Sequence, residues 1–356
     1  MKIKIGDITR IRTGKLDANA ASQNGKYPFF TCSRETLKIS SYSYDCEAVL
    51  VAGNGDLNVK YYKGKFDAYQ RTYIIEDSSN GKLFMPYLYS FMEEYVEQLR
   101  RESIGGVIKY IKLGNLTNAI IDLPDIEQQK AIVFLLNKVK DILSFRRHQL
   151  QQLDTLIKAR FVEMFGDVLT KAKMKDVCSI ITDGTHQPPK FAEEGIPFIF
   201  VSNITNNEID YNAEKHISQD TYDDLIKRTP IEMGDIVLST VGSYGHPAVV
   251  KSHQKFLFQR HIAYLKPRQD IVNSEFLHSA ILSNDVQNRI NENVKGIAQK
   301  TLNLSAIKNL EIPLPNLRQQ EKFVEFKNCV TQTKATIQQS LDTTQLLLDS
   351  LMQRYF

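Results

Sequence analysis

The sequence predicts an α+β protein in which two pseudo-symmetric mixed α/β domains are joined by two long antiparallel coiled-coil helices. Three observations support this fold class: the chain repeats itself, each copy is rich in short β-branched segments, and each copy ends in a long heptad-patterned helix. We expect a first domain over residues 1–124, a central helix over 125–166, a second domain over 167–315 and a C-terminal helix over 316–356.

The repeat is clearest where each long helix begins. Leu-Pro-Asp-Ile-Glu-Gln-Gln at 123–129 recurs as Leu-Pro-Asn-Leu-Arg-Gln-Gln at 314–320, which is 191 residues later. Phe165 and Phe356 stand at the same offset, so both copies end together. Copies of this length are too long for solenoid repeats, and they indicate a duplicated domain with its own core.

The offset between the copies changes along the chain. Three pairs of matches show this: Gly53 with Gly242 and Gln70-Arg71 with Gln259-Arg260 at an offset of 189, and Pro28-Phe29 with Pro197-Phe198 at an offset of 169. The second copy therefore carries about twenty extra residues between Pro197 and Gly242, and we place them at 203–232.

Both copies show the same order of elements. Short β-branched stretches bounded by Gly, Asn, Asp or Pro predict strands, at 48–52, 72–75, 235–239 and 248–250. One amphipathic helix follows in each copy, over about 84–99 and about 274–291, and then a Gly-x-x-x-Lys segment and a last short strand.

The long helices have matching starts and heptad patterns. Asp125 and Asn316 are the expected N-caps, each with a glutamine three residues on. Apolar residues recur at heptad positions of both helices and form the expected interface: Leu136, Leu143, Leu150, Ile157, Phe323, Val330, Ile337 and Leu348. The pattern fits a dimerisation arm or a spacer, and its place directly after each copy favours a spacer between the domains.

Composition excludes several classes of protein. With 42% hydrophobic and 24% charged residues and a net charge of +4, the chain is typical of a globular protein and only mildly basic. The four cysteines are scattered, so we expect neither disulfides nor a metal site. The sequence has no apolar run long enough for a membrane span and no secretory signal, and we expect a cytoplasmic protein.

No catalytic constellation is present in the sequence. It lacks a phosphate-binding loop, and Gln-Pro-Pro-Lys at 187–190 has the wrong outer residues for an amino-methyltransferase motif. We therefore predict no catalytic residues and a protein that is not itself an enzyme.

Polar, basic and aromatic residues in loops remain as candidates for DNA contact. Arg can grip guanine and Asn or Gln adenine by two hydrogen bonds, whereas Lys, Ser and Thr more often hold phosphate. The candidates in the first copy are Thr31, Ser33, Arg34, Asn54, Asp56, Lys60, Tyr61, Gln70, Arg71 and Lys109. Those in the second copy are Thr185, His186, Lys190, Ser202, Asn203, Ser243, Tyr244, His246, Gln259, Arg260, Lys295 and Lys300.

Each candidate also has a purely structural interpretation. The Gln-Arg pair occurs in both copies, which favours a structural hydrogen bond or ion pair, because halves that bind different sequences should differ in their base-contacting residues. The loops that diverge most between the copies are therefore the better candidates for base contact, at 31–35 against 202–206 and at 54–62 against 243–249.

Taken in order, these motifs resemble the specificity subunit of Type I restriction–modification systems, over essentially the whole chain. The resemblance rests on the two Leu-Pro-x-x-x-Gln-Gln helix starts and on segments of the second copy at 183–186, 195–198, 234–239 and 296–304. The first copy departs from the pattern, because Gly-Asn-Gly-Asp at 53–56 stands where a fuller Gly-Asp-Ile strand entry is expected.

The resemblance implies two target-recognition domains, each binding one half of a split double-stranded DNA site, with a gap that the helices set. It also implies two methyltransferase subunits that methylate adenine N6 with S-adenosylmethionine, and restriction/translocase subunits that use ATP and Mg²⁺. No cofactor is expected on this chain. The alternatives are a self-contained methyltransferase or endonuclease, and a coiled-coil scaffold that does not bind DNA.

Overall fold

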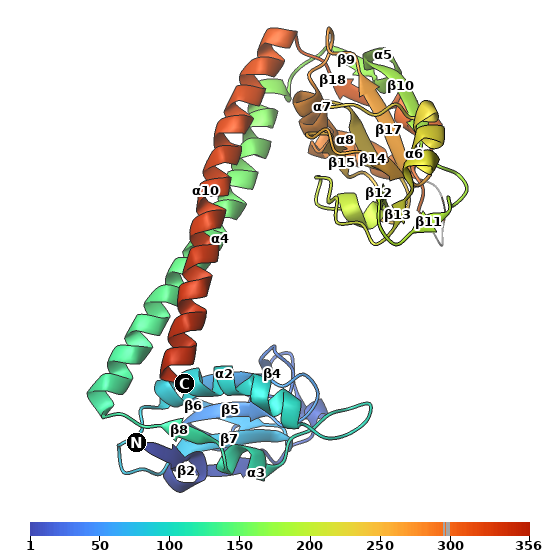
Figure 1. The fold of residues 1–356 in the computed structure, drawn as a ribbon. Coiled ribbons are helices and arrows are strands. Elements are labelled where there is room, and N and C mark those ends of the chain that lie inside the picture. Colours follow the sequence, from blue (N-terminus) through green and yellow to red (C-terminus); the bar gives the residue numbers. More distant parts are fainter. Residues whose placement is uncertain (295, 297–299) are drawn as a thin grey trace. The chain divides into compact units, whose positions relative to one another are not determined.

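The computed structural model describes residues 1–294, 296 and 300–356. Lys295, one of the predicted DNA contacts, lies outside the described residues. Two compact units make up the fold: unit 1 comprises Met1–His148 and Gln338–Phe356, and unit 2 comprises Gln149–Ile337. Helices α4 (Ile126–Phe165) and α10 (Leu317–Tyr355) each contribute to both units (Figure 1).

Unit 1 contains a six-stranded sheet with the order β2-β7-β5-β6-β3-β4 and a small β1-β8 pair. Helix α2 packs on β5 and β6 (Figure 1). The elements are β1 (Lys2–Lys4), α1 (Ile5–Ile8), β2 (Thr9–Thr13), η1 (Ala18–Ala20), β3 (Tyr27–Phe30), β4 (Leu37–Ile39), β5 (Tyr44–Ala52), β6 (Val59–Ala68), β7 (Thr72–Asp77), α2 (Met85–Glu102), α3 (Leu113–Thr117) and β8 (Ile120–Asp122).

Unit 2 repeats this plan with two four-stranded sheets, β10-β17-β14-β15 and β11-β13-β12-β16, and a β18-β9 pair. Its elements are β9 (Lys171–Lys173), α5 (Met174–Val177), β10 (Cys178–Asp183), β11 (Phe191–Ala192), β12 (Ile196–Ile199), η2 (Val201–Ile204), β13 (His216–Ile217), α6 (Gln219–Leu225), η3 (Ile226–Arg228), β14 (Ile236–Ser239), β15 (Pro247–Val249), β16 (Leu257–Phe258), β17 (Ile262–Pro267), α7 (Ser274–Ile281), α8 (Asn284–Asn293), α9 (Leu304–Asn309) and β18 (Glu311–Pro313).

Strand pairing shows that the two units are copies of one fold, and the predicted fold class is confirmed. In unit 1, Phe29 pairs in parallel with Asp67, and in unit 2 Phe198 pairs in parallel with Leu257. The single strand β6, which pairs with both β5 and β3, is divided in unit 2 into β15 and β16, so one sheet becomes two.

Backbone hydrogen bonds correct the alignment of the copies. The same bonds recur in both units: Gly53 N–Arg71 O as Thr240 N–His261 O, Ile111 N–Gly53 O as Leu302 N–Thr240 O, and Gly55 N–Lys109 O as Gly242 N–Lys300 O. Gly242 thus corresponds to Gly55, with φ of 72° and 70°, and the match with Gly53 was wrong. The hairpin loops differ in length between the copies. A residue of the same type stands one or two positions from the structurally equivalent residue, and the sequence comparison matched it instead.

The predicted equivalence of Gln70-Arg71 with Gln259-Arg260 is wrong for the same reason. Gln70 N donates to Leu16 O and Arg260 N donates to Thr185 O, so the two-residue turn is Gln70-Arg71 in unit 1 and Arg260-His261 in unit 2. The side chains at this turn differ between the copies. The shared Gln-Arg pair therefore no longer favours a structural role for these residues.

The predicted insertion in the second copy is real. Phe30 and Ile199 are equivalent, because Tyr69 N and Gln259 N donate to their respective carbonyls. From Phe30 to Gly53 there are 23 positions and from Ile199 to Thr240 there are 41, so unit 2 has gained 18 residues here. Helices η2, α6 and η3 lie in this longer segment.

One predicted helix of unit 2 is broken. The expected helix at about 274–291 is observed as α7 and α8, which are separated at Leu282 and Ser283. The Ser283 hydroxyl accepts from Val286 N and thereby caps α8, so a new helix start competes with continuation of α7. In unit 1 the corresponding helix α2 is continuous.

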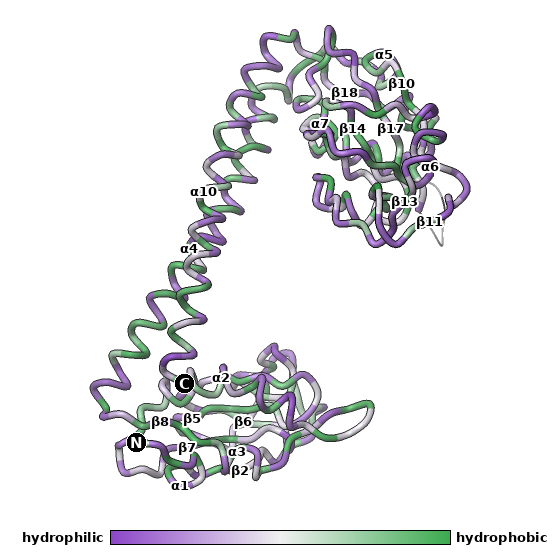
Figure 2. Tube along the Cα trace, viewed as in Figure 1, coloured by the Kyte–Doolittle hydropathy of each residue, from purple (hydrophilic) through white to green (hydrophobic). Residues whose placement is uncertain are grey.

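The long helices begin as predicted. Gln128 N donates to Asp125 Oδ1 at 2.8 Å, and Gln319 N donates to Asn316 Oδ1 at 3.0 Å, which are N-cap hydrogen bonds. Along both helices polar and apolar residues alternate, as expected for a helix with one buried stripe (Figure 2).

The helices contact each other within each unit. In unit 1, Arg147 donates to Gln345 Oε1 at 3.4 Å, and in unit 2 Lys334 pairs with Asp154. Among the predicted heptad residues, Leu136, Leu143, Phe323 and Val330 are buried, and Leu150, Ile157, Ile337 and Leu348 are half-buried.

Each long helix ends on the core of a domain. Phe356 lies 5.1 Å from Tyr87 of α2 in unit 1, and Phe165 lies 5.1 Å from Phe276 of α7 in unit 2, measured between ring centroids. Phe165 also contacts Phe161 and Phe323 in a fully aromatic cluster. These contacts bury large apolar side chains where helix and domain meet.

Candidate nucleic-acid interface

Four loops of unit 1 meet in one place, which we term loop cluster 1 (residues 31–35, 53–60, 69–71 and 109–110). Arg71 O accepts from Gly53 N at 2.8 Å and from the Cys32 thiol at 3.5 Å. Gly55 N donates to Lys109 O at 2.9 Å, and Asn54 pairs with Tyr110 in an isolated bridge. The structure thus brings together all of the first copy's predicted contacts except Tyr61.

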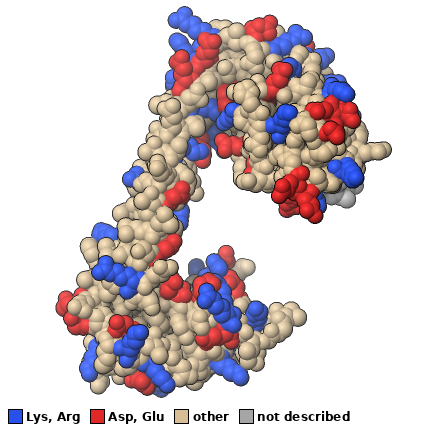
Figure 3. Space-filling model, viewed as in Figure 1, with Lys and Arg blue, Asp and Glu red and all other residues tan. Residues whose placement is uncertain are grey.

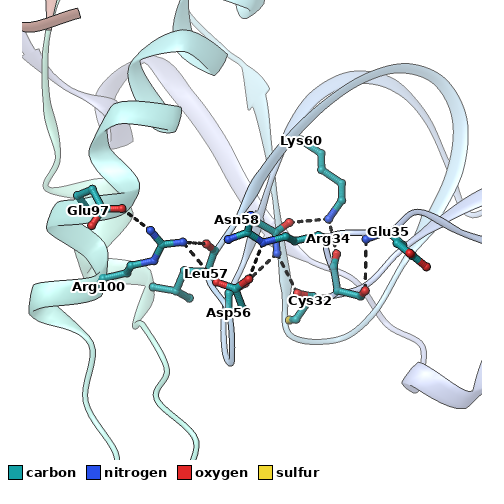
Figure 4. Close-up of polar contacts among 10 residues, drawn as sticks. Cys32, Arg34, Glu35, Asp56, Leu57, Asn58, Lys60, Glu97 and Arg100 are labelled. Carbon is teal, nitrogen blue, oxygen red and sulfur yellow. Dashed lines mark hydrogen bonds and ion pairs between the residues drawn. The ribbon is translucent and has the colours of Figure 1, made fainter. Parts of the chain in front are cut away.

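Arg34 and Asp56 form the polar centre of loop cluster 1 (Figure 4). Arg34 Nε donates to Asp56 Oδ2 at 2.6 Å, and Arg100 of α2 reaches the other carboxylate oxygen at 3.3 Å. Arg100 also donates to Leu57 O at 2.9 Å and fixes the 53–58 loop to α2. The hydrogen bond from Arg34 lowers the pKa of Asp56, so this carboxylate is ionised at neutral pH.

Lys60 belongs to loop cluster 1, and its ammonium is anchored by hydrogen bonds within the cluster. Its ammonium donates to Ser33 O and to Asn58 Oδ1, both at 2.6 Å, and Asn58 Nδ2 donates to Cys32 O at 2.9 Å. Burial lowers the pKa of Lys60. Thr31 is buried, and its hydroxyl accepts from Ser33 N, which shapes the turn that carries Arg34.

Tyr61 lies outside loop cluster 1. It is on β6 opposite Val49, and its hydroxyl donates to Glu47 Oε1 at 2.6 Å. Burial and Glu47 raise the pKa of Tyr61 to about 12. Its ring borders an open hollow of about 440 Å³ that Arg34, Lys60 and Tyr89 also line.

Unit 2 has an equivalent loop cluster 2 (residues 183–186, 240–243, 259–261 and 300–301). Thr185 pairs with Gln259, Thr240 N donates to His261 O at 2.9 Å, and Gly242 N donates to Lys300 O at 3.2 Å. The close approach of these loops needs Gly184, where a Cβ atom would lie 2.3 Å from Phe258 O. Ser243 follows Gly242 and is exposed.

Asp183 is the polar centre of loop cluster 2. One carboxylate oxygen accepts from Arg228 at 2.7 Å, and the other lies 2.9 Å from His186 Nε2. Arg228 belongs to η3, in the segment that only unit 2 has, and the sequence analysis missed it. Its partner is 45 residues away in the chain, and no local pattern connects the two.

The remaining candidates of unit 2 lie apart from loop cluster 2 or are engaged by other residues. His246 Nδ1 lies 3.0 Å from Asn207 Oδ1, Asn203 Oδ1 accepts from Phe200 N at 3.0 Å, and Tyr244 donates to Asn291 at 2.9 Å. Ser202 is exposed on η2, and Lys190 is exposed just before β11. These hydrogen bonds give Asn203 a structural role within the inserted segment and join His246 to Asn207 of that segment.

Charge on the surface is mixed rather than of one sign. On the face drawn in Figure 3, Lys and Arg are interspersed with Asp and Glu on both units, which agrees with a net charge of only +4. Among the described residues, no group of three His, Cys, Asp or Glu is placed to hold a metal ion. No helix in the described part of the chain is long and apolar enough to cross a membrane.

The chain matches a family model twice over. The model for the Type I restriction modification DNA specificity domain covers residues 1–155 and 169–343, and the chain belongs to this family. The curated relatives and the solved structures that the chain resembles are specificity subunits of Type I restriction systems.

Among curated relatives, the EcoDI specificity subunit of Escherichia coli is 36% identical over 156 residues, which cover 44% of this chain and 34% of that protein. The EcoBI specificity subunit of the same species is 24% identical over 281 residues, which cover 70% of this chain and 58% of that protein. The chain therefore spans about a third of the first relative and somewhat over half of the second.

Solved structures share the fold. A Type I restriction–modification S subunit from M. genitalium has a TM-score of 0.61 at 15% identity, and the match covers 100% of this chain and 96% of that one. A chain from a study of complex assembly and conformational transition of the Type I system has a TM-score of 0.63 at 15% identity, with the same coverage.

Proposed function

We propose that the chain recognises a bipartite double-stranded DNA site and directs partner methyltransferase and restriction subunits to it. Each domain would bind one half-site through its loop cluster. The observation that carries this proposal is the recurrence of one loop cluster in two units, with cationic side chains held at equivalent and at divergent positions.

The equivalent and divergent positions suit different tasks. Lys109 and Lys300 are both exposed, and both accept a hydrogen bond from an equivalent glycine, so they suit a feature common to every half-site, the phosphate backbone. Arg71 and His261 occupy one turn position with different chemistry, which suits contact with different bases.

Catalysis and cofactors would belong to the partners. S-adenosylmethionine would bind to the methyltransferase subunits, and ATP and Mg²⁺ to the restriction/translocase subunits. The paired helices α4 and α10 would set the gap between the half-sites, since both run from one unit to the other.

Binding of the full chain, copurified with its methyltransferase subunit, to a randomised duplex library tests the proposal. Selected duplexes should share two short blocks at a fixed gap, and affinity should fall steeply with salt because phosphate contacts release counterions. Weak, salt-insensitive binding without a motif would favour the scaffold alternative. Methylation of DNA by the purified chain alone with S-adenosylmethionine would favour the enzyme alternative.

A further inference from the structure

Arg228 reaches loop cluster 2 from the segment that unit 1 lacks. Its guanidinium donates to Asp183 Oδ1 at 2.7 Å, while 52% of its side chain stays exposed. Asp183 ends β10, and its side chain is only 18% exposed. The two residues after it, Gly184 and Thr185, lead directly to the Arg260-His261 turn, because Arg260 N donates to Thr185 O.

The same chemistry occurs in unit 1 at a different place in the fold. There Asp56 holds Arg34 and Arg100. Asp56 follows β5, whereas Asp183 ends β10, whose equivalent strand β2 has Thr13 at that position. A carboxylate that pairs with an exposed arginine is therefore present in both loop clusters, but the two carboxylates do not occupy equivalent positions of the repeat.

A guanidinium held in this way is prepared for a two-point contact. Arginine has five N–H donors, and one carboxylate oxygen occupies only part of them, so the rest can face guanine O6 and N7. Holding a long side chain in place before binding removes part of the entropic cost of ordering it. Arg228 is held by Asp183 before any DNA binds, and the exposed half of its side chain leaves N–H donors for a base.

We propose that Arg228 is a base-contacting, specificity-determining residue of the second domain and that Asp183 is its positioning residue, as Asp56 is for Arg34 in the first. The inference rests on the proposed DNA-binding function. The proposal also assigns a role to the inserted segment, because that segment carries Arg228 to loop cluster 2.

A simple tether is the competing interpretation, in which the ion pair only fastens η3 to β10. Lys227 provides a matched control, because it is the preceding residue on η3, is 74% exposed and, within the described part of the chain, pairs only with nearby Asp224 at 3.4 Å. A tether can affect stability and overall affinity, but it leaves the preferred bases unchanged.

The test uses the full chain with its methyltransferase subunit and a duplex library randomised across both half-sites. Wild type, Arg228→Ala, Arg228→Lys, Asp183→Asn and Lys227→Ala are compared. Arg228→Ala should lose about tenfold or more of the preference for a guanine in one half-site. The other half-site and the gap should stay unchanged, and Lys227→Ala should return the wild-type motif.

Arg228→Lys separates charge from geometry. Lysine keeps the positive charge but lacks the planar fork, so this variant should keep its overall DNA affinity and still lose the base preference. Asp183→Asn should weaken the preference in the same half-site. An Arg228→Ala protein that selects the wild-type motif would overturn the inference and leave the proposed function standing, whereas a wild type that selects no motif would overturn both.

Discussion

Gln129 and Gln320, 191 positions apart in the chain, make the same three hydrogen bonds in the two domains. Gln129 accepts from Phe84 N and donates to Lys82 O and Pro124 O, each at 2.8 Å. Gln320 does the same with Asn273, Ile271 and Pro315. Both side chains are fully buried. The second glutamine of the Leu-Pro-x-x-x-Gln-Gln motif thus joins each long helix to the loop before α2 or α7.

Replacing either buried glutamine should destabilise its domain. Gln320→Ala leaves one buried N–H and two carbonyls without partners, which we expect to cost about 2 kcal/mol or more. Thermal unfolding of the full chain measures this cost. The adjacent, exposed Gln319 is the matched control, because its own contact to Asn316 uses the backbone N–H and survives in Gln319→Ala. Equal unfolding midpoints for the two variants would refute this role.

Lys109 and Lys300 should act on affinity without acting on sequence preference. Lys109→Ala and Lys300→Ala should each reduce the slope of log affinity against log salt by about one, because one phosphate contact is lost. The preferred bases in both half-sites should be those of the wild type. A changed base at either half-site would assign these lysines to base contact instead.

His278 should make unit 2 sensitive to acid. Its Nε2 lies 3.1 Å from Asn207 O and its Nδ1 lies 3.3 Å from Lys327 Nζ, so the neutral ring donates to the carbonyl and accepts from the ammonium. Burial and the nearby Lys327 lower the pKa of His278 to about 4, and Lys251 adds to this while Glu275 opposes it.

The sign of the effect follows from the lowered pKa. In the unfolded chain the ring takes up a proton near pH 6.5, whereas in the folded chain it stays neutral down to about pH 4. Stability is therefore fully present above pH 6.5 and is lost as the pH falls towards 4, by up to about 3 kcal/mol. His278→Gln should flatten the fall of the unfolding midpoint between pH 7 and pH 4.5. His253→Gln, at an exposed histidine, should not, and parallel curves for wild type and His278→Gln would contradict the assignment.

The helices should set the gap of the DNA site. Arg147 and Gln345 are hydrogen-bonded across α4 and α10, so a seven-residue insertion after each keeps the heptad register. About 10 Å of added helix corresponds to roughly three base pairs. Both half-site sequences should stay as they are while the selected gap lengthens. If the protein with the insertions still binds both half-sites and the gap is unchanged, the helices do not set the gap.

Local patterns in the sequence predicted the parts of the fold that depend on them. The N-caps Asp125 and Asn316, the long helices and the β-branched strands follow from neighbouring residues. The break between α7 and α8 was missed, because Ser283 was treated as part of an amphipathic run rather than as a cap. Residues of the expected interface between the long helices were predicted from heptad spacing alone. Leu136, one of them, is fully buried, which agrees with this prediction.

Loop lengths and distant ion pairs were harder to predict. Gly53 was matched with Gly242, because the letters agree, whereas hydrogen bonding pairs Gly55 with Gly242. Arg34 and Asp56 were both proposed as DNA contacts, but their mutual ion pair could not be inferred from a separation of 22 residues. Arg228 was missed, since only the folded chain brings it to Asp183.

The most direct measurement is single-molecule methylation sequencing of DNA from cells that express this chain with its methyltransferase subunit, compared with cells that lack the chain. We expect a new N6-methyladenine motif made of two short blocks at a fixed gap. A soluble, copurifying complex that leaves no new motif in the genome would contradict the claim that this chain directs methylation to a bipartite DNA site.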